Sequence, residues 1–173
     1  MELRHALLGL LAVRPMSGYD LNKAFAGSAA HFWYADQSQI YRVLDKLGAG
    51  GHIATEDVPQ RGKPDRKVHS LTERGRAELS AWLASPLEEE RVKSAFLARL
   101  FFSETLGREG VLALLDEREQ QLRQQLARLD EIEVEAASLA GVVRAATLEY
   151  GLAGARAELE WIERTRRAVE EAS

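Results

Sequence analysis

Cysteine is absent from this chain of 173 residues, which removes several functions at once. Without cysteine the protein has no disulfide framework, no thiol nucleophile and no cysteine-ligated zinc. The four histidines are scattered and lack the spacing of metal ligands: His5, His31, His52 and His69. We therefore expect neither a bound metal nor a cofactor.

Long hydrophobic runs are scarce as well. Near the N-terminus, the apolar stretch from Ala6 to Val13 is interrupted by Gly9, and no small-residue cleavage site follows it. A helix needs about 20 apolar residues to cross a bilayer. We therefore expect no membrane partner and a cytoplasmic location.

The common enzyme motifs are missing too. No glycine-rich phosphate loop follows a buried strand, and no paired carboxylates or nucleophile motif stand where a pocket is expected. We expect this protein not to be an enzyme.

The chain lacks an excess of positive charge, and its net charge of -4 argues at first against a nucleic-acid partner. The net charge differs between the two halves of the chain. Residues 1–85 carry 11 basic and 9 acidic side chains, whereas residues 86–173 carry 12 basic and 18 acidic ones. We predict two domains with these bounds, of which the first is suited to an anionic partner.

Three helical patterns occupy the first third of the chain. The first has leucines at helical spacing and ends before Pro15, because proline disfavours the α conformation of the preceding residue. Ser17 with Asp20 is an N-capping pattern that begins the second helix. Asp36 with Gln39 repeats the pattern and begins the third. The order predicts a helix-turn-helix arrangement with a long connector.

The third helix is predicted to have two different faces. Its apolar side is formed by Ile40, Val43, Leu44 and Leu47. The opposite side presents residue types that contact DNA, namely Ser38, Gln39, Tyr41, Arg42 and Lys46. In a major groove, Gln pairs with adenine and Arg with guanine, while hydroxyl groups reach phosphates. The alternative interpretation is an ordinary solvated helix face.

Two short strands around a glycine-proline turn follow, and a fourth helix begins at Thr72 and ends at Ser85–Pro86. The predicted fold is therefore a winged helix-turn-helix with a two-stranded wing. The wing carries four cations within seven residues, Arg61, Lys63, Arg66 and Lys67. These cations repel one another, and contact with DNA phosphates would explain why they are clustered. The alternative is a solvated loop. Tyr19, near the start of the second helix, is a further candidate backbone contact.

The second half of the chain is predicted to be all-α. Its last helix has a seam in steps of four and three, typical of a coiled coil, formed by Leu148, Leu152, Ala155, Leu159 and Ile162. Such a seam packs helices within one chain or between chains, and we predict that it holds a dimer. Gly151 and Gly154 each cost about 1 kcal/mol in a helix, a cost that close approach of another helix would justify, although simple tolerance is the alternative.

Aromatic side chains in this half suggest an effector pocket. The candidates for binding a small aromatic molecule are Phe96, Phe101, Tyr150 and Trp161. The alternative is that these side chains belong to the core.

Three stretches together resemble the PadR family of bacterial transcriptional regulators. They read LLGLLAVRPMSGYDL, SQIYRVLDKLGAGGHI and QRGKPDRKVHSLTERGRAEL, and the helical second half resembles that of the longer, virulence-activator-like members. The resemblance implies a homodimer with an N-terminal winged helix and a C-terminal dimerisation region, often a repressor released by a small molecule. It also implies DNA contacts from the third helix and the wing.

We therefore expect a homodimeric regulator that binds double-stranded DNA at an inverted repeat, with half-sites about 34 Å apart. The principal alternative is a winged-helix protein-interaction or scaffold module that binds no DNA. A third possibility is a small-molecule sensor or carrier with weak DNA affinity.

Overall fold

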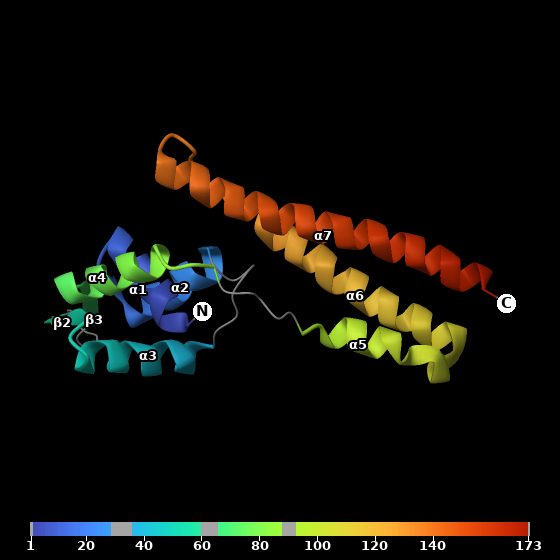
Figure 1. Ribbon diagram of the computed structural model, residues 1–173, viewed down its shortest axis with the longest axis horizontal. Coiled ribbons are helices and arrows are strands. Elements are labelled where there is room, and N and C mark those ends of the chain that lie inside the picture. The colour runs from blue at the N-terminus through green and yellow to red at the C-terminus, as the bar shows by residue number, and fades with distance from the viewer. Residues whose placement is uncertain (1, 29–35, 60–65, 88–92, 173) are drawn as a thin grey trace. The chain divides into compact units, whose positions relative to one another are not determined.

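A computed structural model describes residues 2–28, 36–59, 66–87 and 93–172 of the chain. The chain divides into two compact units, residues 1–89 and 90–173, and each is described by itself. Helices predominate in both units (Figure 1). None of the described helices is long and apolar enough to cross a membrane.

The N-terminal unit is a winged helix-turn-helix, as predicted. Its elements in chain order are α1 (Leu3–Val13), β1 (Met16–Ser17), α2 (Gly18–Ser28), α3 (Gln37–Ala49), β2 (Ile53–Val58), β3 (Arg66–Leu71) and α4 (Glu73–Leu83). Helix α1 is central and packs against α2, α3, α4 and β3. Its side chains Leu7 and Leu8 are completely buried, because apolar faces of the surrounding elements converge on them.

The sheet has three antiparallel strands in the order β1-β3-β2, one more than the predicted two. The extra strand β1 pairs Met16 with His69. Two residues are too short for any periodicity, so only tertiary pairing reveals this strand. The β2–β3 hairpin pairs Ile53 with Leu71 at its base and Val58 with Arg66 toward the turn.

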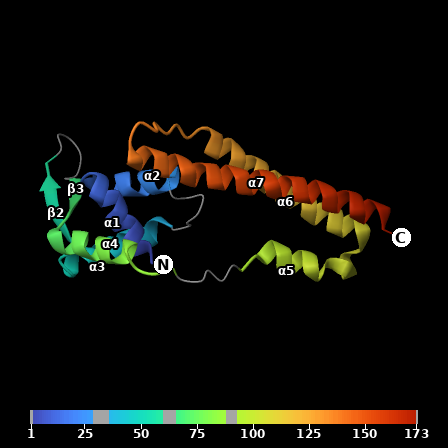
Figure 2. The ribbon, with the colours of Figure 1, turned by 45° about the horizontal axis from the view of Figure 1, so that its top comes forward.

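The C-terminal unit is all-α, as predicted. It contains α5 (Ala95–Phe101), a 3₁₀ helix η1 (Ser103–Leu106), α6 (Gly107–Asp130) and α7 (Leu139–Glu171). Gly107 has φ 65°, a conformation that favours glycine, and it marks the corner between η1 and α6. Helices α6 and α7 lie side by side along much of their length (Figure 2).

The predicted coiled-coil seam exists, but its partner is α6 of the same chain. Three seam residues are buried, Leu152, Ala155 and Ile162. Of these, Ala155 and Ile162 belong to the same core as Leu115 and Leu122 of α6. Leu148 and Leu159 are half-buried. For Ala155, Leu159 and Ile162, the assignment of the seam to the subunit interface needs correction, because side chains packed against α6 are not available to a second chain. For Leu148 and Leu152 the assignment stays a prediction. A heptad pattern predicts that a helix packs against another helix, but it does not identify that helix.

Arginine-carboxylate pairs connect the same two helices. Arg118 of α6 donates two hydrogen bonds of 2.8 Å to the Glu158 carboxylate of α7. Arg166 of α7 binds both Asp116 and Glu119 of α6, and the hydrogen bond to Asp116 raises its pKa above the ordinary arginine value. Arg166 is therefore paired within the chain.

Candidate nucleic-acid interface

Helix α3 begins at a complete capping box. The Asp36 carboxylate accepts a hydrogen bond of 2.8 Å from the Gln39 backbone N–H, and the Gln39 side-chain oxygen accepts one of 3.2 Å from the Asp36 backbone N–H. The Ser38 hydroxyl also donates to Asp36 and is the main reason why the pKa of this carboxyl is lowered. Local sequence thus fixes where this helix starts.

The two faces of α3 are divided as the sequence predicts. Ile40, Leu44 and Leu47 are buried in the core and Val43 is half-buried. The exposed residues include all five proposed DNA contacts on this helix, Ser38, Gln39, Tyr41, Arg42 and Lys46. The predicted polarity of the helix is confirmed, whereas the DNA contacts themselves stay a prediction.

The exposed polar side chains are not equally free to bind. The Gln39 amide oxygen already accepts a hydrogen bond in the capping box, which restricts the orientations in which the amide could pair with adenine. Arg42 donates from Nε to the Ser38 backbone carbonyl at 3.3 Å. Within the described residues its two terminal nitrogens have no hydrogen-bond partner. Arg42 is therefore better placed than Gln39 to read a base.

Tyr41 has a structural contact that the sequence did not reveal. Its ring lies against Gly18, the first residue of α2, so that a Cβ atom added to Gly18 would stand 2.5 Å from Tyr41 Cε1. This contact joins α3 to the start of α2. The glycine in the S-G-Y-D stretch was the only available signal, since a buried glycine often marks close approach of a neighbour.

Replacing Gly18 by alanine is expected to displace the Tyr41 ring, which is 41% exposed and can move toward solvent, and to destabilise the N-terminal unit by about 1 kcal/mol. In a Tyr41→Ala background the same change is expected to be neutral or stabilising, since alanine suits a helix better than glycine. Urea unfolding measures both values. Gly9→Ala is the matched control, because a Cβ there meets nothing within 4 Å. Equal effects of Gly18→Ala in both backgrounds would refute the contact.

The wing cations are only partly described. Arg66 lies at the start of β3 and forms an ion pair with Asp20 of α2, which ties the wing to the second helix. Lys67 is exposed and faces Asp57 across the hairpin. Arg61 and Lys63 lie outside the described residues. Lys67 is thus an available cation, whereas Arg66 already has a partner within the fold.

The start of α2 adds a further exposed side chain. Tyr19 is 68% exposed, next to the reciprocal cap in which the Ser17 hydroxyl accepts from the Asp20 backbone N–H at 3.2 Å. The Asp20 carboxylate accepts the Ser17 hydroxyl at 2.8 Å as well as binding Arg66. Asp20 is therefore a positioning residue that the sequence identified only as a helix cap.

His69 lies in strand β3 of the wing and is 9% exposed. Its Nδ1 is 2.9 Å from the Thr55 hydroxyl on the neighbouring strand. Burial lowers its pKa from the ordinary value of 6.5, and the nearby Asp45 opposes that effect. The neutral ring is thus favoured in the folded protein.

A buried neutral histidine makes stability depend on pH. Because the folded-state pKa of His69 is below its unfolded value near 6.5, the unfolded chain binds more protons as the pH falls through 6.5. The free energy of unfolding should therefore decrease between pH 7 and pH 5, by at most about 1.4 kcal/mol per pH unit for this group. His69→Gln should reduce that slope while keeping a partner for Thr55. His5, whose pKa is also lowered by burial, should supply a remaining slope. Unchanged slopes in His69→Gln would contradict this.

Two other histidines converge on one carboxylate. His52 Nε2 lies 2.8 Å from Glu78 of α4, and Arg4 of α1 lies 2.7 Å from the same carboxylate. His5 stacks on Trp82 with ring centroids 4.8 Å apart. These contacts hold α1, α4 and the start of β2 together and give these histidines structural partners.

The predicted effector residues are only partly brought together. Phe96 and Trp161 meet edge to face with centroids 6.2 Å apart. Phe101 and Tyr150 are 82% and 79% exposed, on α5 and α7. The four aromatic side chains therefore do not line one described pocket.

A capped helix with an exposed polar face, set beside a two-stranded wing, defines a winged-helix protein of the DNA-binding class. The chain belongs to the PadR-like family of transcriptional regulators, whose model matches residues 7–81; a second model, virulence activator alpha C-term, matches residues 92–170. Members of this family are regulators and not enzymes.

Two bacterial proteins illustrate the relationship. The negative transcriptional regulator PadR of Bacillus subtilis is 35% identical over 133 residues, which cover 76% of this chain and 71% of that protein. A probable transcriptional regulator of Mycobacterium tuberculosis is 41% identical over 91 residues, which cover 53% of this chain and 48% of that protein, about half its length.

Solved structures agree with the sequence comparison. The crystal structure of Bacillus subtilis PadR in complex with operator DNA has a TM-score of 0.84 at 29% identity and covers 96% of this chain and 98% of that one. The structure of the same regulator in complex with p-coumaric acid has a TM-score of 0.76 at 28% identity and covers 98% and 99%.

Proposed function

We propose that this protein is a homodimeric, sequence-specific DNA-binding regulator that acts as a repressor and is released by a small-molecule effector. The N-terminal unit would bind DNA, and the C-terminal unit would hold the dimer and the effector. The observation that carries the proposal is the division of α3 into a buried apolar face and an exposed face with Arg42 and Lys46. A protein that binds chromosomal DNA works in the compartment that contains it, here the cytoplasm.

The DNA-binding role rests on geometry and charge together. An α-helix fits the major groove, and the exposed face of α3 offers a guanidinium whose terminal nitrogens have no described partner. Lys67 on the wing supplies a cation for a neighbouring phosphate. The relative with operator DNA bound has the same fold, which supports this arrangement for the present chain.

The dimer role requires a surface other than the α6–α7 seam. Helix α7 has a second, exposed line of apolar and small side chains, the α7 apolar stripe, formed by Leu139, Val143, Ala146, Tyr150, Ala153 and Ala157. Its first turns run beside the extended segment 131–138 and beyond the end of α6 (Figure 2). Within this chain a Cβ added to nearby Gly154 would meet nothing within 4 Å. A helix of a second copy is the occupant we propose, since a homodimer would place two such stripes together.

The proposals of repression and of a small-molecule effector are based on the relatives. Bacillus subtilis PadR is a negative regulator, and its structure has been solved with p-coumaric acid, a small aromatic acid. These facts support, for the present chain, a repressor that responds to a small molecule.

Selection of bound fragments from a genomic DNA pool tests the proposed function directly. We expect enrichment of an inverted repeat whose half-sites are about one helical turn apart. Enrichment of single half-sites would contradict the dimer. Failure to bind any fragment at low salt would refute the regulator and leave the protein-interaction module as the explanation of the fold.

A further inference from the structure

One arginine of the wing is held by a carboxylate of α2. Arg66, the first residue of β3, donates a hydrogen bond to Asp20 Oδ2 and forms an ion pair with it. The same oxygen atom accepts hydrogen bonds from the Ser17 hydroxyl at 2.8 Å and from the Ser17 backbone N–H at 3.3 Å. Three donors therefore converge on Asp20 Oδ2, and the Arg66 guanidinium is the charged one among them.

Backbone pairing keeps the two charged groups together. The Ser17 hydroxyl caps α2 by accepting the Asp20 backbone N–H at 3.2 Å, and Ser17 also pairs with Val68 between β1 and β3. Arg66 stands two residues before Val68 and therefore on the same face of β3. A helix cap and a strand pair thus bring the carboxylate and the guanidinium together before any DNA is bound.

This ion pair lies beside the proposed DNA-contacting face of α3. Gly18, two residues before Asp20, lies against the ring of Tyr41, which is 41% exposed on α3. The side chains of Arg66 and Asp20 are 43% and 27% exposed, so a DNA backbone could reach them. A DNA phosphate and the Asp20 carboxylate are therefore competitors for the same guanidinium.

We propose that Asp20 withholds Arg66 from the DNA backbone, so that this wing cation adds no net phosphate contact. The carboxylate stands beside Arg66 in the free and in the bound protein, whereas a phosphate must approach from solution. The two charges cancel, and a neutral pair releases no counterions from DNA. The inference rests on the proposed function and identifies a residue that limits attraction to DNA of any sequence. Discrimination between sequences is left to α3, because phosphate contacts carry no sequence information.

The salt dependence of DNA binding tests this assignment on the full-length protein. Fluorescence anisotropy with operator and scrambled duplexes gives the slope of the logarithm of affinity against the logarithm of salt. Asp20→Asn keeps an oxygen atom for the two hydrogen bonds from Ser17 and removes the charge that holds Arg66. In a dimer the slope should become steeper by about 2, and at about 0.1 M salt both duplexes should bind about tenfold or more tightly.

The double variant Asp20→Asn, Arg66→Gln shows whether Arg66 is withheld in the wild-type protein. Removing a neutral pair should leave the wild-type slope, whereas removing a phosphate contact would reduce the magnitude of the slope by about 2. An unchanged slope in Asp20→Asn, or a reduced slope in the double variant, would each overturn the proposal. Circular dichroism shows whether the variants keep their helices.

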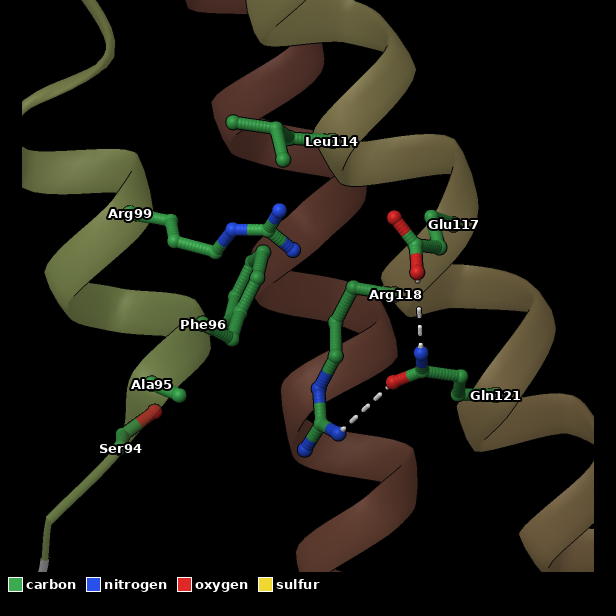
Figure 3. A pocket seen from close by; sticks show the side chains of 8 residues that line it. All are labelled: Ser94, Ala95, Phe96, Arg99, Leu114, Glu117, Arg118 and Gln121. Atoms are coloured by element: carbon green, nitrogen blue, oxygen red, sulfur yellow. Dashed lines mark hydrogen bonds between the residues drawn. The ribbon is translucent and has the colours of Figure 1, made fainter.

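Glu158→Gln is the matched control, because it makes the same change of charge and frees a paired arginine in the unit that is not proposed to contact DNA. The arginine is Arg118 of α6, which donates two hydrogen bonds of 2.8 Å to Glu158 and one of 3.5 Å to Gln121 (Figure 3). The slope should stay at the wild-type value.

A steeper slope in Glu158→Gln as well would show that net charge alone causes the effect, and it would overturn the proposal. Failure of the wild-type protein to bind any DNA would overturn the proposed function. DNA binding by the wild-type protein without the expected effect of Asp20→Asn overturns this inference alone.

Discussion

Replacing Arg42 by alanine is expected to remove most of the preference of this protein for its operator over unrelated DNA. A bidentate arginine–guanine pair is worth about 1–3 kcal/mol of discrimination, and a dimer has two half-sites. Specific affinity should therefore fall between about 30-fold and about 10⁴-fold, while affinity for unrelated DNA changes little. Fluorescence anisotropy with operator and scrambled duplexes measures both quantities.

Lys67→Gln provides the contrasting variant. A phosphate contact carries no sequence information, so this change should weaken operator and scrambled DNA by similar factors. If each subunit neutralises about four phosphates, the logarithm of affinity should fall with the logarithm of salt at a slope of about -7, and loss of Lys67 from both subunits should reduce the magnitude of that slope by about 2. Arg76→Gln, an exposed change on α4, should leave both duplexes unaffected. The reverse pattern for Arg42 and Lys67 would show that helix and wing have exchanged roles.

Placing a carboxylate on the α7 apolar stripe is expected to produce a monomer. Val143 is 54% exposed within one chain, and in the proposed dimer Val143→Glu would bury an unpaired charge in each subunit. Operator affinity should fall by about 10²-fold or more, because two linked DNA-binding units gain that much from binding together. Light scattering gives the mass, and circular dichroism shows whether the helices persist.

Arg144→Glu is the control for this variant, since it also introduces a carboxylate at an exposed position of the same helix, about 100° round the helix axis from Val143. It should remain a dimer with wild-type operator affinity. A dimeric Val143→Glu protein would place the subunit interface elsewhere. The exposed apolar side chains from α5 to the end of η1, Leu97, Phe101, Phe102 and Leu106, would then be the next surface to test.

Local patterns in the sequence predicted the features that depend on neighbours along the chain. The capping pair Asp36 and Gln39 and the apolar spacing after it defined the start and polarity of α3, and the structure confirms both. Such interactions span three or four residues, so their geometry follows from the sequence spacing alone. The sequence pattern assigned Gln39 both to the N-terminal cap of α3 and to DNA contact. It did not show that the cap already uses the amide oxygen of Gln39.

Only the tertiary structure decided which distant residues meet. Arg66 is predicted as a free wing cation, yet Asp20, 46 positions away, pairs with it. The two-residue strand β1 forms because β3 is beside it. These pairings depend on the fold, which no short-range pattern describes.

What the sequence by itself determined is therefore the winged-helix class, the orientation of α3 and the helical character of the second half. The tertiary structure determined the partner of the α7 seam, which is α6 of the same chain, and with it the exposed stripe that remains for a second copy. The physical reason is that a periodic apolar face predicts only that this face of the helix is buried. Chain connectivity and packing determine which element buries it.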